Sequence, residues 1–169
     1  MSQNSGILPL LAYRLTARAA APWVPLALRR RARAGREDPA RLGERLGQPG
    51  CNRPAKPLVW LHAASVGELL SLLTLLQALP GDTAAFTPLV TTGTVTSAAL
   101  AAERLPETAI HQYAPVDLAA PVNRFLGYWR PALALRVESE LWPNQIEALR
   151  IAEIPMLLVN ARLSPRSEA

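Results

Sequence analysis

The chain has 169 residues, of which half are hydrophobic and 18% are charged, so one packed domain with a short extension is expected. The single cysteine, Cys51, excludes an internal disulfide and a cysteine-based metal site, and it favours a reducing, cytoplasmic setting. The net charge of +5 is concentrated in residues 1–50, where nine arginines face only three acidic residues. Such a segment favours a polyanion, either anionic lipid or nucleic acid.

Residues 7–28 are apolar but do not have the pattern of a membrane-spanning helix. A spanning helix needs about 20 consecutive apolar residues, whereas Arg14 and Arg18 interrupt this stretch, and Pro22 and Pro25 break its helix. No small-residue cleavage site follows, so a cleaved signal peptide is not expected either. The sequence therefore predicts a helix that lies in the membrane interface.

The two sides of this N-terminal helix differ in character. Arg14 and Arg18 are four residues apart and share one face, while leucines and alanines occupy another. The apolar face consists of Leu8, Leu11, Leu15 and Ala19; Tyr13 and Trp23 suit a headgroup layer; and the basic cluster Arg29, Arg30, Arg31, Arg33 and Arg36 follows. We expect residues 1–50 to form a membrane-associating segment and linker. The alternative is a helix packed on its own domain.

From residue 57 onward, short apolar runs alternate with helical patterns. The expected strands are residues 58–62, 87–92, 109–113, 133–137 and 154–159, and the expected helices are residues 68–79, 94–104, 118–129 and 143–150. Regular alternation predicts parallel strands joined by right-handed crossovers. Residues 51–169 are therefore expected to form a Rossmann-like, doubly wound α/β domain, with its site at the carboxyl ends of the strands.

The loop after the first expected strand has two interpretations. Ser65 and Glu68 form the spacing of a capping box, in which Ser65 caps a helix and Glu68 reaches back to the chain. Alternatively, Glu68 performs acid–base chemistry, and Gly67 lets a ligand approach the backbone. His62, at the end of the strand, is more often a satisfied core histidine than a catalyst. No dinucleotide-binding fingerprint is present.

Three further loops place polar residues at strand ends. Thr92 and Thr94 precede a helix whose N–H groups could hold an anion, or they simply cap it. Two acids, Glu138 and Glu140, either contact substrate hydroxyls or serve as a cap and an arginine partner. The fourth loop contributes Asn160 and Arg162; the arginine could pair with phosphate or carboxylate groups or belong to an ordinary linker. No metal-ligand spacing accompanies these residues, so no metal is expected.

At these same loops the sequence resembles the Kdo (3-deoxy-D-manno-octulosonic acid) transferase family. The matching stretches are Arg41-Leu-Gly-Glu-Arg-Leu-Gly47, Trp60-Leu-His-Ala-Ala-Ser-Val-Gly-Glu68, Val90-Thr-Thr-Gly-Thr-Val-Thr-Ser97, His111-Gln-Tyr-Ala-Pro-Val-Asp117, the run from Arg130 to Asn144 that contains Glu-Ser-Glu-Leu-Trp-Pro-Asn, and Val159-Asn-Ala-Arg-Leu-Ser164. They follow the family order from about residue 41 to the end. The Glu-Ser-Glu-Leu-Trp-Pro-Asn and Asn-Ala-Arg-Leu-Ser strings are the specific ones.

The resemblance implies the N-terminal, acceptor-binding half of a two-domain GT-B glycosyltransferase that transfers Kdo from CMP-Kdo to a lipid A precursor in lipopolysaccharide synthesis. It implies that Glu68 is the general base, and that Ser65, Gly67, Thr92, Thr94, Glu138, Glu140, Asn160 and Arg162 line the cleft. No cofactor is expected. The family continues into a donor-binding domain beyond this chain's last residue, so we expect these residues to be inactive alone.

The resemblance also implies a location, the cytoplasmic face of the bacterial inner membrane, held peripherally or by an N-terminal anchor through Arg14, Arg18, Trp23, Arg29, Arg30 and Arg31. A non-catalytic module that binds membrane and lipid A is the alternative function. Nucleic acid is not an expected partner, because the expected domain lacks a basic stripe with interleaved aromatic residues.

Overall fold

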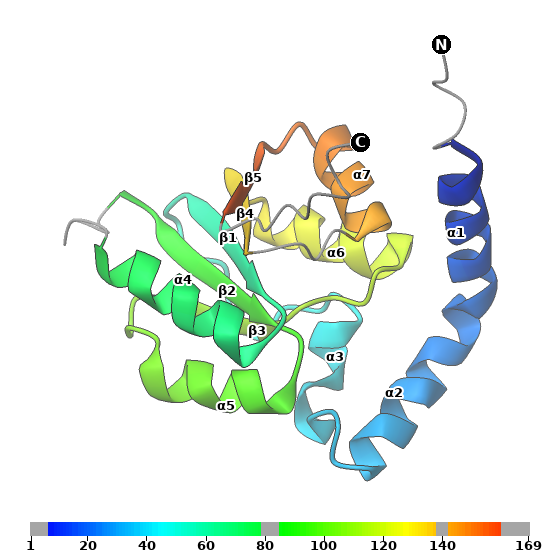
Figure 1. Ribbon diagram of the computed structural model, residues 1–169, viewed down its shortest axis with the longest axis horizontal. Coiled ribbons are helices and arrows are strands. Elements are labelled where there is room, and N and C mark those ends of the chain that lie inside the picture. Colours follow the sequence, from blue (N-terminus) through cyan, green and yellow to red (C-terminus); the bar gives the residue numbers. More distant parts are fainter. Residues whose placement is uncertain (1–6, 79–84, 138–141, 160–169) are drawn as a thin grey trace, which may run out of the picture.

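The computed structural model describes residues 7–78, 85–137 and 142–159, as an α/β domain preceded by two helices (Figure 1). The helices are α1 (Ile7–Ala20), α2 (Val24–Arg33), α3 (Leu42–Arg45), α4 (Val66–Ala78), α5 (Val95–Arg104), α6 (Ala119–Trp129) and α7 (Pro143–Ile151). The strands are β1 (Leu58–Ala63), β2 (Thr87–Thr92), β3 (Ile110–Tyr113), β4 (Leu133–Val137) and β5 (Met156–Val159). Two 3-10 turns, η1 (Ala21–Trp23) and η2 (Pro39–Arg41), complete the described elements.

The described strands form one parallel sheet in the order β3-β2-β1-β4-β5. From β1 the chain winds outward through β2 and β3, then returns to the other side of β1 with β4 and β5. The strand order therefore reverses between β1 and β4. In doubly wound sheets, ligands bind at the carboxyl ends of the strands beside such a reversal. The predicted Rossmann-like fold class is confirmed.

Helices cover both faces of the sheet, α4 and α5 on one side and α6 and α7 on the other (Figure 1). Strand β1 supplies both cores because successive side chains point to opposite faces. Leu58 and Trp60 pack with α6 and α7, whereas Leu61 and Ala63 pack with α4 and α5. Burial on both faces explains why the strands read as continuous apolar runs rather than alternating ones.

The predicted helix break in the N-terminal segment is confirmed. Helix α1 ends at Ala20, η1 contains Pro22, and Pro25 lies in the first turn of α2, where a missing N–H costs nothing. No helix in the described residues is long and apolar enough to cross a membrane. The two helices lie to one side of the domain, and α3 lies between α2 and the sheet (Figure 1).

Element boundaries differ from the predicted ones by at most two residues, and the two differences of that size, at the starts of α4 and β5, each have a local cause. Helix α4 begins at Val66 because Ser65 occupies its N-cap position. Strand β5 begins at Met156 rather than at residue 154 because Glu153 adopts a left-handed backbone with φ 55°. The left-handed residue follows the last turn of α7 and stops the helix there. The backbone N–H of Ile154 then donates a hydrogen bond to the carbonyl of Leu149, so Ile154 does not join the sheet.

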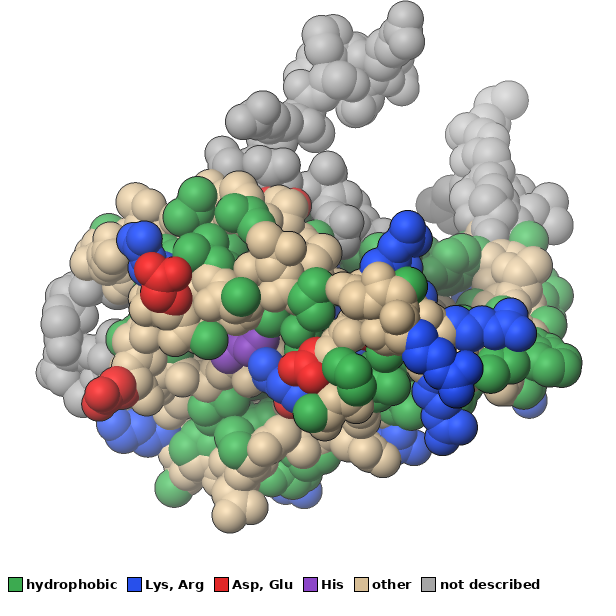
Figure 2. Space-filling model, turned by 90° about the horizontal axis from the view of Figure 1, so that it is seen from below, with side chains coloured by type: hydrophobic (Ala, Val, Ile, Leu, Met, Phe, Trp, Pro, Cys, Tyr) green, Lys and Arg blue, Asp and Glu red, His purple; other side chains and the backbone are tan. Residues whose placement is uncertain are grey.

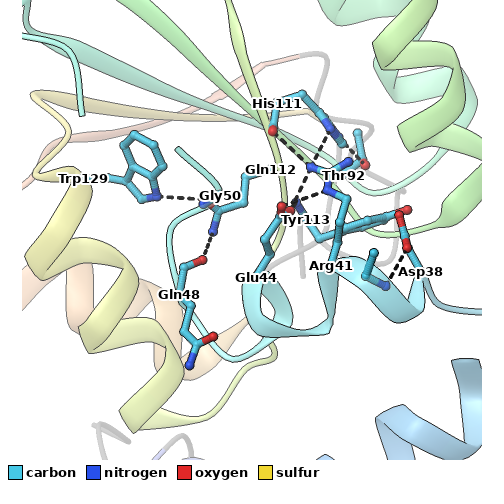
Figure 3. Close-up of polar contacts among 11 residues, drawn as sticks. Asp38, Arg41, Glu44, Gln48, Gly50, Thr92, His111, Gln112, Tyr113 and Trp129 are labelled. Carbon is cyan, nitrogen blue, oxygen red and sulfur yellow. Dashed lines mark hydrogen bonds and ion pairs between the residues drawn. The ribbon is translucent and has the colours of Figure 1, made fainter. Parts of the chain in front are cut away.

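Helix α3 is attached to the end of β3 by a network of polar contacts (Figure 3). The Glu44 carboxylate, 6% exposed, accepts two hydrogen bonds from Arg41, both at 2.8 Å, and one from the backbone N–H of Tyr113 at 2.7 Å. Arg41 also donates to the carbonyl of His111 at 3.1 Å, and its guanidinium carbon lies 4.7 Å from the Tyr113 ring centroid. The motif Arg41–Gly47 therefore has a structural role.

The glycine that ends this motif is required by its conformation. Gly47 has φ +81°, and a Cβ atom there would collide with the backbone carbonyl of Pro121 at the start of α6. The close approach also lets Arg124 donate to the Leu46 carbonyl at 2.5 Å. Residues 41–47 are thus packed against both β3 and α6.

Candidate active site

A cavity of about 630 Å³ lies at the carboxyl ends of β1, β2 and β3. Its walls come from both parts of the described chain, the sheet with its loops and the N-terminal helices. The lining residues are Tyr13, Thr16, Ala17 and Ala20 from α1 and Val24 from α2; Arg45 from α3; His62 from β1 and Ala64 after it; Gly93 and Thr94 after β2; Ala114 to Leu118 after β3; and Trp142 and Gln145 at α7. Most of this surface is apolar. A mostly apolar lining with a few polar groups is typical of a small-molecule site.

One wall of the cavity is helix α1, which is held against the domain by Tyr13. Its hydroxyl donates to Asp117 at 2.7 Å, across 104 residues of sequence. Burial, together with the Asp117 carboxylate, raises the pKa of Tyr13, so the phenol remains a donor throughout the physiological range. Arg14 adds a longer contact of 3.8 Å to Glu147 on α7. The face of α1 that carries Tyr13 therefore packs on the domain, which is the alternative considered from the sequence.

Asp117 joins α1 to α7. Besides Tyr13, its carboxylate accepts the backbone N–H groups of Asn144 at 3.1 Å and Gln145 at 2.9 Å, and its carbonyl accepts the Asn144 side chain at 2.7 Å. A carboxylate at this place satisfies N–H groups that a helix leaves free and suits the helix dipole. The positions of α1 and α7 are therefore coupled through one side chain.

Glu68 folds back onto the loop that precedes its own helix. Its carboxylate is 8% exposed, and it accepts the Ala64 backbone N–H at 2.8 Å and the Ser65 hydroxyl at 3.1 Å. The Ser65 hydroxyl in turn accepts the Glu68 N–H at 3.3 Å. These contacts are those of the capping interpretation, with the N–H of Ala64 taking the place of the cap residue's own N–H. Glu68 does not itself line the cavity, but Ala64 does.

The other predicted cleft residues that the structure describes occupy different positions. Ser65 and Gly67 are exposed, and Gly67 has no neighbour within the described chain that requires a glycine. Thr94 lines the cavity and caps α5 through Ser97. Thr92 is fully buried and hydrogen-bonds His111 Nε2 at 2.9 Å, away from the cavity lining. The structure therefore brings Thr94 to the cavity but not Thr92.

His62 is buried and hydrogen-bonded, as predicted for a core histidine, and it is also one of the residues that line the cavity. Its Nδ1 lies 2.9 Å from the Thr91 hydroxyl. Burial, reinforced by the nearby positive charge of Arg136, lowers the pKa of His62 to about 3. The imidazole is therefore neutral at physiological pH.

Among the described residues that line the cavity, Arg45 is the only lysine or arginine. Its guanidinium donates to the Ala114 carbonyl at 2.5 Å and lies 3.2 Å from the Glu37 carboxylate. Glu37 also pairs with Arg31 at 2.9 Å, so two arginines share one buried acid. Burial lowers the pKa of Arg45 below its usual value, although not far enough for an arginine to lose its proton. Arg45 therefore stays positively charged at the cavity wall, although Glu37 offsets part of that charge.

Four of the predicted cleft residues, Glu138, Glu140, Asn160 and Arg162, lie outside the described residues. Within residues 7–78, 85–137 and 142–159, no group of three histidine, cysteine or acidic side chains is placed to hold a metal ion.

The face of α1 opposite the cavity is apolar and exposed. Leu11 and Leu15 are 53% and 61% exposed, and Trp23 is 69% exposed. Arg18, Arg29 and Arg30 are also exposed, whereas Arg31 pairs with Glu37. Figure 2 shows arginine side chains gathered among apolar ones at the end of the molecule that the N-terminal helices form. Tyr13, expected in a headgroup layer, instead faces the domain.

Three residues of the site, Tyr13, Arg45 and Asp117, were not singled out from the sequence as cleft residues. Their contacts join segments that are 69 to 104 residues apart. For Arg45 and Asp117 the available signal was their place in the stretches that resemble the family. For Tyr13 no local signal distinguished a domain contact from a lipid contact.

A family model described as 3-deoxy-D-manno-octulosonic-acid transferase (kdotransferase) matches residues 40–169. Among curated proteins, "Probable 3-deoxy-D-manno-octulosonic acid transferase, mitochondrial" of Arabidopsis thaliana is 36% identical over 162 residues, covering 96% of this chain and 36% of that protein. The 3-deoxy-D-manno-octulosonic acid transferase of Rickettsia felis is 42% identical over 114 residues, covering 67% and 24%. That of Haemophilus influenzae is 37% identical over 128 residues, covering 75% and 30%. This chain thus spans roughly a third or less of each of these relatives.

Proposed function

Because this chain belongs to the Kdo transferase family, as the N-terminal domain of such an enzyme, we propose that it binds the lipid A precursor that accepts Kdo from CMP-Kdo. The observation that supports this role is the cavity at the carboxyl ends of β1 to β3. One wall is the helix α1, whose outer face exposes leucines, and the other lining residues include Arg45 and Thr94. An amphiphile with a phosphorylated sugar headgroup complements that division of apolar and cationic surface.

Within this proposal, Glu68 is the general base. It takes the proton of the acceptor hydroxyl as that oxygen attacks the anomeric carbon of Kdo, and CMP leaves from the opposite side, which inverts the carbon. Each oxygen of Glu68 accepts one hydrogen bond in the described structure, and a carboxylate oxygen has capacity for a second. The same contacts hold the carboxylate in one orientation beside the cavity wall at Ala64.

A transfer assay tests the function directly. The 169-residue chain is incubated with CMP-Kdo and a lipid A precursor, alone and joined to the remaining portion of the Haemophilus influenzae relative. We expect the joined protein to transfer Kdo, measured as the mass increase of the precursor. A joined protein that folds, binds CMP-Kdo and still transfers nothing to the lipid A precursor would rule out this acceptor.

We also propose that the outer face of α1 and α2 binds an anionic membrane, at the cytoplasmic face of the bacterial inner membrane. The exposed Leu11, Leu15 and Trp23 would enter the interface, and Arg18, Arg29 and Arg30 would meet lipid phosphates. Nucleic acid would use the arginines but not the leucines. The apolar side chains therefore distinguish the two polyanions.

Vesicle binding tests the membrane proposal. We expect the chain to bind vesicles containing phosphatidylglycerol more weakly as salt is raised, and Leu15→Glu to weaken that binding at least about tenfold, because a buried leucine contributes about 1.5–3 kcal/mol. Leu70→Glu is the matched control, since Leu70 is 49% exposed on α4 and should leave binding unchanged. Equal loss in both variants, or tighter binding to an oligonucleotide than to vesicles, contradicts the proposal.

A further inference from the structure

His62 is a polar group at the cavity wall that the roles of Glu68, Arg45 and Thr94 leave unused. It is the fifth residue of β1, and in register it lies between Thr91 of β2 and Arg136 of β4. His62 is among the residues that line the cavity, although it is only 3% exposed. Nδ1 is bound to Thr91, and Nε2 has no hydrogen-bond partner in the part of the chain that the structure describes.

The proton of the neutral ring is placed by its neighbours. The Trp60 indole N–H lies 2.8 Å from the Thr91 hydroxyl, and an indole can only donate, so the hydroxyl accepts there. Thr91 has no other side-chain partner among the described residues, so its hydrogen can be donated to His62 Nδ1 at 2.9 Å, which favours the tautomer that accepts at Nδ1. A neutral imidazole that accepts at Nδ1 carries its hydrogen on Nε2.

The surrounding charges keep the ring in this state. Arg136 is 1% exposed, lies over the Trp60 ring with its guanidinium carbon 5.0 Å from the centroid, and donates to Gln145. Arg45 adds a second, weaker positive field. Burial and both cations oppose protonation, and they outweigh a contact with the Thr91 backbone that favours it. With hydrogen on Nε2, the neutral ring acts as a hydrogen-bond donor at that nitrogen.

We propose that His62 Nε2–H donates a hydrogen bond to a headgroup oxygen of the sugar acceptor and so orients it in the cavity. This inference rests on the proposed function. The assignment differs from that of Glu68, because His62 binds the substrate without exchanging a proton with it. A neutral donor bound to a fixed partner suits this task, since it loses no side-chain freedom when the ligand arrives.

Nuclear magnetic resonance tests the proton position. Long-range proton–nitrogen correlation spectra of the 15N-labelled chain distinguish a ring nitrogen that carries hydrogen from one that does not. The chain has two histidines, and the signals lost in His62→Gln are those of His62. We expect hydrogen on Nε2 alone, and we expect the Nε2 signal to shift when detergent-solubilised lipid A precursor is added.

Two variants test the contact. In His62→Gln the side-chain amide reaches the position of Nε2, so we expect precursor binding within about threefold of the wild type. In His62→Asn the amide reaches only the position of Nδ1, so it still meets Thr91 but offers nothing to the cavity. We expect about tenfold weaker binding for this variant. Thermal melting of each variant confirms that both are folded.

The possible results separate this inference from the proposed function. Three results would overturn the His62 contact: hydrogen on Nδ1, a charged ring, or an Nε2 signal that does not shift when precursor binds. None of them affects the proposed acceptor. Equal binding by His62→Asn and the wild type would overturn the contact in the same way. If the folded wild type does not bind the precursor at all, the acceptor assignment fails, and this contact fails with it. If His62→Asn does not fold, the position of the ring hydrogen in the spectra and the precursor affinity of His62→Gln still test the contact.

Discussion

Replacing Glu68 by glutamine in the joined transferase should lower kcat for Kdo transfer by about 10²–10⁴-fold, the contribution usual for a positioned general base. Glutamine has the same shape, and its carbonyl oxygen still accepts the Ala64 N–H, while the Ser65 hydroxyl accepts from its amide. The loop before α4 should therefore persist, and KM for the precursor should change little. Initial rates at several precursor concentrations measure both constants.

Ser65→Ala is the matched control, because it removes the cap and retains the carboxylate. Loss of an N-cap hydroxyl costs about 1 kcal/mol of stability, so this variant should melt earlier yet keep its activity to within about tenfold. Glu68→Gln is thus expected to lose activity and keep its stability, whereas Ser65→Ala is expected to lose stability and keep most of its activity. If Glu68→Gln retains nearly full activity, Glu68 is only a helix cap, and Glu138→Gln and Glu140→Gln become the variants to assay.

Glu44→Ala should lower the free energy of unfolding by about 3–5 kcal/mol, the cost of removing one partner from a buried ion pair. The change leaves the Arg41 guanidinium without its carboxylate and the N–H of Tyr113 without an acceptor. It also detaches α3, which carries Arg45 to the cavity. Urea denaturation of the 169-residue chain, followed by circular dichroism, measures the loss.

A surface pair with the same spacing provides the control. Arg150 also makes two hydrogen bonds to an acid three residues away, Glu147, at 2.8 and 3.1 Å. The Arg150 side chain is 71% exposed and that of Glu147 24%, and ion pairs at the surface contribute little because water and salt screen them. Glu147→Ala should therefore have no large effect. Similar losses in the two variants would show that the Glu44 contacts are as weak as a surface pair.

The sheet and its helices were predictable because their signals are local. Strands such as Leu58–Ala63 are buried on both faces and so form apolar runs, and the helices between them begin with caps such as Ser65 and Thr94. The alternation of these elements implies parallel pairing, and parallel pairing brings the carboxyl ends together. These steps together predict that the site lies at the carboxyl ends of the strands, which is where the cavity is found.

The composition of the cavity was not predictable in the same way. Whether Tyr13 faces lipid or the domain depends on Asp117, which is 104 residues away. The helical period gives α1 two usable faces, and no pattern within residues 7–28 selects one of them. Glu68 shows a different limit, since a capping box and a general base require the same residue at the same spacing. The contacts establish the cap, and only the chemistry of transfer can establish the base.

The position of α1 has a consequence for how an acceptor would arrive. One side of this helix lines the cavity, and the other side exposes Leu11 and Leu15. With that outer side lying in the bilayer as proposed, only the thickness of one helix separates the cavity from the acyl chains. A lipid could then present its headgroup while its tails remain among other lipids. The encounter becomes a two-dimensional search along the membrane plane, and no lipid has to be extracted into water.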